Sequence, residues 1–185
     1  MTCIIAYKQD GKVYMAGDSA GVAGHDIRTR KDPKVFVNQG MAYGFTTSFR
    51  MGQILMNFNR PKHAIDSTEP ISDYQYLTGL FMDAIIKEFR DKGYAKEKDS
   101  QISGGNFLIG YHGEIYEICD DFQVGIVDSD FACVGCGENY AYGAMEALEK
   151  QTHLINDPQR LLEEALDIVN LYSAGVCPPF NIVSI

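Results

Sequence analysis

The order of the predicted elements favours an α+β fold, a four-layer αββα sandwich formed by a single domain over residues 1–185. Strand-like segments come in two groups, and each group is followed by two helix-like segments. The β–α–β alternation that is typical of a doubly wound parallel sheet is absent. A length of 185 residues suits one domain with a core of its own.

The first group of strands opens the chain with a β-hairpin. Asp10-Gly11 is a strong turn signal between two apolar runs. The polar, glycine-containing residues 21–33 predict a loop. The strands expected in this group cover residues 3–7, 12–17, 34–38 and 41–45.

Two helices are expected next. Ser48 is a candidate N-cap for a helix that stops near Pro61, and Ser72 is a candidate N-cap for one that ends at Gly93. Apolar residues of the second helix recur with the spacing of one helical face, namely Tyr76, Leu77, Leu80, Phe81, Ala84, Ile85 and Phe89.

The second half repeats the pattern after residues 95–104, which are charged and predict a surface loop. Gly135-Cys136-Gly137 turns the chain into a helix. Asp157 at the N-cap and Pro158 at the first helical position open the last helix. The strands and helices expected here cover residues 106–111, 114–119, 131–134, 138–150, 158 to about 173, and 180–185.

Composition narrows the function classes. A net charge of −9 makes nucleic acid an unexpected partner, because the only basic cluster (Arg28, Arg30, Lys31 and Lys34) is short and interleaved with Asp26 and Asp32. No apolar run approaches the roughly 20 residues of a membrane span, and the N-terminus lacks the features of a signal peptide. Five cysteines, an odd number, argue against a disulfide framework. We therefore expect a cytoplasmic protein without a membrane partner.

The N-terminus suggests a nucleophile. Thr2 is small enough for Met1 to be removed, which would leave a hydroxyl and a free α-amine on one residue. Such an amine has an ordinary pKa near about 7.7–8.0, so it can serve as the base for its own hydroxyl. Asp18 follows a predicted strand and Lys34 begins another. A buried Lys34, fixed by Asp18, would lower the pKa of a neighbouring amine by charge repulsion.

Four segments together resemble the proteasome β-subunits and the bacterial peptidase HslV, members of the N-terminal-nucleophile hydrolases. These segments are Thr2-Cys3-Ile4-Ile5-Ala6 with Gly11-Lys12-Val13, then Ala16-Gly17-Asp18-Ser19 with Lys34-Val35, then Gly135-Cys136-Gly137-Glu138-Asn139-Tyr140-Ala141-Tyr142-Gly143-Ala144, and Asn170-Leu171-Tyr172-Ser173. The resemblance extends from residue 2 to about residue 175 and rests on the order and spacing of all four segments.

The resemblance implies a catalytic set of Thr2, Asp18, Lys34, Cys136 and Ser173. Cys136 stands where the family has a serine, and Asn170 stands where proteasome subunits have an aspartate. The amides of Thr46-Thr47-Ser48, which replace the usual glycines, would form the oxyanion hole. Ala20, Asp32 and Thr46 are candidate walls of the pocket beside Thr2.

The function that this resemblance implies is a threonine endopeptidase that acts on peptides or unfolded proteins within a homo-oligomeric ring. Maturation would need only the removal of Met1, and an AAA+ ATPase is a possible partner. No cofactor and no metal are expected. Two alternatives stay open: a catalytically silent ring subunit, which a retained Met1 would favour, and an amidohydrolase that acts on small amides.

A redox or zinc role for Cys133 and Cys136 is a weaker alternative, because a lone CxxC lacks the further ligands of a structural zinc site. The histidines lie in unrelated sequence contexts and predict no metal site: His25, His63, His112 and His153.

Overall fold

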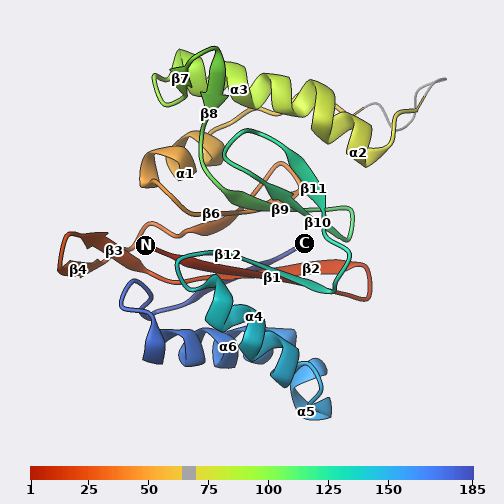
Figure 1. The fold of residues 1–185 in the computed structure, drawn as a ribbon. Coiled ribbons are helices and arrows are strands. Elements are labelled where there is room, and N and C mark those ends of the chain that lie inside the picture. Colours follow the sequence, from red (N-terminus) through yellow and green to blue (C-terminus); the bar gives the residue numbers. More distant parts are fainter. Residues whose placement is uncertain (64–69) are drawn as a thin grey trace.

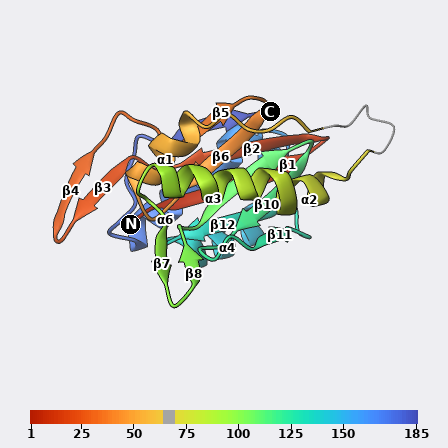
Figure 2. The same ribbon diagram turned by 90° about the horizontal axis from the view of Figure 1, so that it is seen from above.

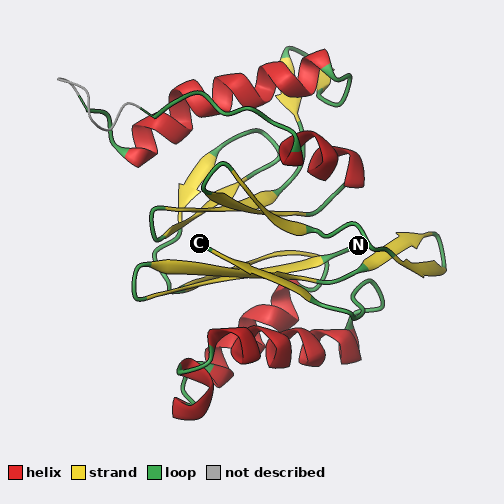
Figure 3. Cartoon of the chain, turned by 180° about the vertical axis from the view of Figure 1, so that it is seen from behind, coloured by secondary structure: helices red, strands yellow, loops and turns green. Residues whose placement is uncertain are grey.

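Two antiparallel sheets lie face to face, and helices cover the outer face of each sheet (Figures 1 and 3). The computed structural model describes residues 1–63 and 70–185. The predicted four-layer αββα sandwich is therefore confirmed. The first sheet, here called the β1 sheet, has the order β12-β1-β2-β13; the second, the β6 sheet, has the order β11-β10-β9-β6-β5.

The strands of both sheets follow the predicted segments closely. The β1 sheet contains β1 (Cys3–Gln9), β2 (Lys12–Gly17), β12 (Phe131–Gly135) and β13 (Asn181–Ser184). The β6 sheet contains β5 (Val35–Asn38), β6 (Met41–Phe45), β9 (Phe107–Tyr111), β10 (Glu114–Ile118) and β11 (Val124–Ile126). Strand β11 was not predicted, because its three residues are too few to establish a pattern.

The two outer layers are helical. Above the β6 sheet lie α1 (Phe49–Met56), α2 (Asp73–Tyr76), a π-helical turn η1 (Leu77–Phe81) and α3 (Met82–Asp91) (Figure 1). Below the β1 sheet lie α4 (Glu138–Leu148), α5 (Thr152–Ile155) and α6 (Pro158–Tyr172). The short helix α5 was not predicted.

The predicted N-caps are confirmed. The Ser48 side chain accepts a hydrogen bond from the amide of Arg50, and Asp157 accepts one from the amide of Arg160. Ser72 forms a capping box with Gln75. Each cap satisfies amide groups that have no partner within the helix, which explains why these helices begin where they do.

The single helical face expected after Ser72 is partly wrong. Leu80 was predicted to lie on the buried face, yet it is 55% exposed. The π-helical turn at Leu77–Phe81, with Gly79 outside helical backbone angles, inserts an extra residue into the helix. Residues before and after the turn therefore do not share one continuous face, while Ile85 and Phe89 remain buried as expected.

Two predicted loops are hairpins instead. The predicted loop 21–33 contains β3 (Ala20–Ala23) paired with β4 (Asp26–Thr29), and the predicted loop 95–104 contains β7 (Lys96–Lys98) paired with β8 (Gln101–Ser103). Both are largely exposed and lack the alternation of a strand with one buried face. The β3–β4 hairpin projects from the body at the end where the N-terminus lies (Figure 2).

The core has three apolar parts, one between each pair of adjacent layers. An aromatic-rich part joins the β6 sheet to α1 and α3, another joins the β1 sheet to α4 and α6, and a third lies between the two sheets. Between the sheets there is no room for a side chain at Gly44. A Cβ atom there would clash with Ile4 and would lie 2.6 Å from the sulfur of Met15, both on the β1 sheet.

Antiparallel pairing brings the predicted site residues to one end of the sandwich. In the β1 sheet, Cys3 faces Gly135 and Ile4 faces Gly17, so Thr2, Asp18 and Cys136 lie at adjacent strand ends. In the β6 sheet, Val35 faces Gly44, so the residues just before β5 and just after β6 lie at the same end.

Candidate active site

The centre of the site is an ion pair between Lys34 and Asp18. The Lys34 Nζ atom lies 3.0 Å from Asp18 Oδ1 and 2.9 Å from Oδ2, and both side chains are almost fully buried. The carboxylate also accepts hydrogen bonds from the amides of Cys3 at 2.9 Å and Ala20 at 2.8 Å. Asp18 is thus held by both flanking strands and in turn fixes the position of the lysine head group.

Burial lowers the pKa of this lysine. Removal from water lowers the pKa of Lys34 from its ordinary value near 10.5, while the charge and the hydrogen bonds of Asp18 oppose that change. The lysine therefore combines a fixed position with a weakened hold on its proton.

Thr2 lies directly beside this pair. Its side chain is buried, and its backbone N–H donates to the Sγ atom of Cys136 at 3.2 Å. Cys136 Sγ in turn lies 3.6 Å from the Oγ atom of Ser173. The structure therefore connects the nitrogen of Thr2 to Cys136 and then to Ser173, which caps the end of α6.

Met1 engages the same groups. The hydroxyl of Thr2 donates to the carbonyl oxygen of Met1, and Lys34 Nζ donates to the same oxygen at 3.4 Å. While Met1 is attached, the nitrogen of Thr2 is an amide, which is not basic. The Met1 side chain rests against Gly175, where a Cβ atom would clash with it.

The loop after β6 forms the opposite wall. The amide of Thr46 donates to Asn106 O at 3.1 Å, and the amide of Ser48 donates to Thr46 O at 2.6 Å. Within residues 1–63 and 70–185, the amide of Thr47 has no hydrogen-bond acceptor. Thr47 also has a φ of +59°, a left-handed value that is uncommon for a branched residue. Such strain is often found where a backbone group is held for a ligand.

A small cavity of about 70 Å³ separates Thr2 from this loop. Ala20 and Thr46 line it, as predicted. Asp32 is not part of its lining; it binds the guanidinium of Arg30 at 2.8 and 2.6 Å instead. That ion pair is exposed, and it holds the pKa of Asp32 below its usual value.

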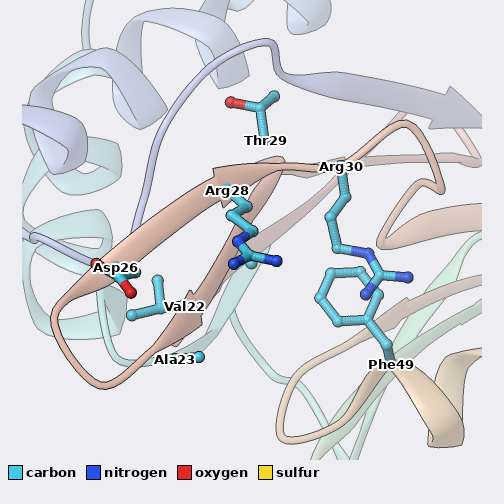
Figure 4. A pocket seen from close by; sticks show the side chains of 8 residues that line it. Val22, Ala23, Asp26, Arg28, Thr29, Arg30 and Phe49 are labelled. Atoms are coloured by element: carbon cyan, nitrogen blue, oxygen red, sulfur yellow. The ribbon is translucent and has the colours of Figure 1, made fainter.

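A larger pocket of about 510 Å³ lies along the β3–β4 hairpin. It adjoins the cavity beside Thr2, since Val22 and Phe49 line both. Figure 4 shows the guanidinium groups of Arg28 and Arg30 in this pocket, with Arg30 stacked on the Phe49 ring at 3.8 Å. The pocket was not predicted, because the sequence pattern of residues 21–33 indicates a loop.

Close backbone approach explains a glycine at the end of β12. Gly135 has a φ of +109°, and a Cβ atom there would clash with the carbonyl oxygen of Thr2. Glycine thus lets the turn to α4 pass against the backbone of Thr2 and bring Cys136 to the nitrogen of Thr2.

Five predicted residues therefore converge in space: Thr2, Asp18, Lys34, Cys136 and Ser173. Asn170 lies one turn earlier on α6 and is half-buried, and no hydrogen bond joins it to Thr2 among the described residues. The hydroxyl of a threonine, an adjoining nitrogen and a lysine cation can together support nucleophilic attack on a carbonyl once that nitrogen is a free amine.

The four-layer sandwich is the N-terminal-nucleophile hydrolase fold, as the resemblance in sequence implied. Solved structures with the fold include Thiobacillus denitrificans BPH, with a TM-score of 0.78 and 18% identity over 100% of this chain and 97% of that one. Its complex with Epoxomicin aligns with a TM-score of 0.76 and 17% identity, over 100% and 98% of the two chains.

Two further structures share the fold. Eukaryotic HslV from Trypanosoma brucei aligns with a TM-score of 0.68 and 16% identity over 99% of this chain and 98% of that one. The Anbu (Gly-1) mutant from Hyphomicrobium sp. strain MC1 gives 0.69 and 14%, over 98% and 80%. No family model and no curated protein matches the sequence.

Across the described residues, every helix is too short or too polar to traverse a lipid bilayer.

Proposed function

We propose that the chain is a threonine endopeptidase whose nucleophile is the hydroxyl of Thr2 after removal of Met1. The observation that carries the proposal is the buried Lys34–Asp18 pair, with its lysine within 3.4 Å of the Met1 carbonyl oxygen, directly beside Thr2. Burial of an ion pair carries a desolvation cost that the attraction between its charges does not always offset, so a buried Lys34–Asp18 pair at this position favours a functional role.

In the proposed reaction the free α-amine of Thr2 takes the proton of the hydroxyl, and the oxygen attacks the carbonyl carbon of a peptide bond. The protonated amine then gives its proton to the departing nitrogen, which leaves an ester on Thr2. Water attacks the ester with the amine again acting as base, and the acid product is released. Lys34 favours the neutral form of the amine by charge repulsion.

Two neighbours support this chemistry. Cys136 and Ser173 form a hydrogen-bonding path to the nitrogen of Thr2 and would orient the amine. Among the described residues the amide of Thr47 has no acceptor, so within the segment Thr46-Thr47-Ser48 we assign it the role of oxyanion donor.

The proposal includes a homo-oligomeric ring in the cytosol, which receives peptides or unfolded proteins with the help of an AAA+ ATPase. Exposed apolar side chains on α4 and α6 support an interface between subunits: Leu171 is 74% exposed, and Tyr172, 67% exposed, stacks on the exposed Tyr140. Negative-stain images and sedimentation of the purified chain test the ring.

The decisive experiment combines mass measurement with labelling. Protein from the native host is weighed to determine whether Met1 is absent, and is then treated with a peptide epoxyketone, which reacts with an N-terminal threonine. We expect a chain without Met1 that gains one inhibitor and cleaves fluorogenic peptides. The Thr2→Ala variant should lose labelling and at least about 10³-fold of the rate. Met1 present on every native chain would reject the proposal and favour a silent ring subunit. Cleavage of small amides but not of peptides would favour an amidohydrolase.

A further inference from the structure

A second cluster of reactive side chains lies at the end of the sandwich opposite Thr2. His112 occupies the turn between β9 and β10, next to the β1–β2 turn, whereas Thr2 precedes the first residue of β1. Figure 1 shows these turns and the N-terminus at opposite ends of the sheets. His63 and Asp73 join His112 there, and their ligand atoms all lie within 4.8 Å of one another.

We propose that His63, Asp73 and His112 bind a divalent transition-metal ion such as Zn²⁺. The two histidines were expected to be unrelated, and folding brings them to one carboxylate. The proposed metal site is separate from the proposed peptidase site, and neither proposal depends on the other.

The spacing of the three groups suits a metal ion. Asp73 Oδ1 lies 3.3 Å from His63 Nδ1 and 3.0 Å from His112 Nδ1. In a tetrahedral zinc site with bonds of about 2.0–2.1 Å, neighbouring ligand atoms are separated by about 3.3 Å. Small side-chain movements would therefore place all three atoms around one ion.

The histidine rings are already oriented for this. His63 Nε2 lies 2.9 Å from the carbonyl oxygen of Ile71, which can only accept, so this nitrogen carries the proton. The Nδ1 lone pair is then directed toward Asp73. A backbone carbonyl that fixes the tautomer in this way is the usual outer partner of a metal-binding histidine.

Aromatic stacking holds both rings in place. The His63 ring stacks on Tyr76 with centroids 4.4 Å apart, and the His112 ring stacks on Tyr111 at 3.8 Å. The Tyr111 hydroxyl lies 3.1 Å from His63 Nδ1 and would donate a hydrogen bond to that nitrogen when no metal is bound. A bound ion would replace this hydrogen bond.

The donor set selects the class of ion. Two imidazole nitrogens and one carboxylate suit Zn²⁺, Ni²⁺ or Cu²⁺ better than Mg²⁺ or Ca²⁺, which prefer more oxygen ligands. Arg60 and Lys62 line the adjoining pocket, and their positive charges disfavour a cation that is held by electrostatic attraction alone. The side chain of His63 is 3% exposed and that of His112 is 43% exposed, so an ion would enter past His112 and keep a water as its fourth ligand.

One bound ion would connect His63, Asp73 in the first turn of α2, and His112 in the β9–β10 turn. The test uses the full chain stripped of metal with EDTA and titrated calorimetrically with Zn²⁺, and with Co²⁺ to read coordination geometry from visible absorption. We expect one ion per chain, a tetrahedral Co²⁺ spectrum and a higher unfolding temperature with Zn²⁺.

Two ligand variants and one control decide the result. Asp73→Asn and His112→Asn should each weaken Zn²⁺ binding by at least about 10–100-fold, while His153→Ala, which changes an exposed histidine outside the cluster, should not. Asparagine tolerates the φ of +48° at position 112, so the turn should be kept in His112→Asn. Circular dichroism checks that both ligand variants fold. No Zn²⁺ uptake, or binding that survives both substitutions and so belongs to a thiol such as the exposed Cys136, would overturn the proposal.

Discussion

The ammonium group of Lys34 contacts both carboxylate oxygens of Asp18, at 3.0 and 2.9 Å, and both side chains are almost fully buried. The two residues come from different sheets, since Asp18 follows β2 and Lys34 precedes β5. Their ion pair therefore joins the β1 sheet to the β6 sheet as well as positioning a charge beside Thr2.

Removal of one member of this pair should destabilise the fold strongly. Asp18→Asn or Lys34→Met alone leaves a buried charge without its partner and should cost about 3–5 kcal/mol in the free energy of unfolding. The double variant should cost clearly less than the sum of the two. Urea unfolding of the four proteins measures the coupling, and additive costs would mean that the pair is not a unit.

The stability contribution of Lys34 should depend on pH in a defined direction. Because burial lowers its pKa, the unfolded chain binds more protons than the folded chain between the lowered value and about 10.5. Stability attributable to Lys34 therefore rises with pH across that window. The difference in unfolding free energy between wild type and Lys34→Met should grow toward alkaline pH, with tyrosine titration common to both proteins. A difference that shrinks would contradict this.

Alkylation should distinguish Cys136 from the core cysteines. Cys136 is exposed and accepts a hydrogen bond from the nitrogen of Thr2, so iodoacetamide should modify it and abolish the peptide hydrolysis that we propose for Thr2. Burial raises the pKa of the Cys3 and Cys133 thiols, which keeps them in the unreactive thiol form until the chain unfolds.

The matched variant for this experiment is Cys136→Ser, which restores the residue expected from the family resemblance. It should stay active within about 10-fold of wild type, since serine keeps a donor at that position, and it should resist iodoacetamide. Equal inactivation of both proteins would place the sensitive thiol elsewhere.

A methyl group at Gly135 should displace Thr2. Gly135→Ala adds a Cβ atom against the Thr2 carbonyl at a φ that alanine disfavours, so we expect a stability loss of about 1–3 kcal/mol and loss of peptide hydrolysis. Gly143→Ala is the control, because open space surrounds this position within α4. It should stabilise the chain by about 0.5–1 kcal/mol and leave activity unchanged.

The hairpin pocket predicts a charge preference among substrates. The charge of Arg30 is paired with Asp32, whereas Arg28 forms no ion pair among the described residues. A peptide that places an acidic side chain in this pocket should be cleaved about 2- to 5-fold more efficiently than a neutral one, a factor typical of an exposed ion pair. Arg28→Glu should reverse the preference in kcat/KM, and an unchanged preference would remove Arg28 from the substrate path.

The layers and the five converging residues were predictable because they depend on local signals and on family resemblance. Asp10-Gly11 marks the first hairpin, and Thr2, Asp18 and Lys34 each lie next to a strand whose pattern is clear. The exposed β3–β4 hairpin was missed because its strands bury no continuous face. The shift at Leu80 arises from a π-helical turn that residue spacing does not reveal.

The His63–Asp73–His112 cluster was missed for another reason. No local pattern relates these residues, and only the folded chain brings His63 and Asp73 to the β9–β10 turn. Its existence is a property of tertiary structure.

The tight packing at Gly44 predicts where substitutions can abolish the proposed activity. Thr2 and Cys136 adjoin strand ends of the β1 sheet, whereas Lys34 and Thr47 adjoin strand ends of the β6 sheet. The geometry of the candidate site therefore depends on the distance between the two sheets. A side chain at Gly44 would wedge against Ile4 and Met15 and widen that gap from within. Inactivating substitutions can therefore be found deep between the sheets, at positions that never meet a substrate.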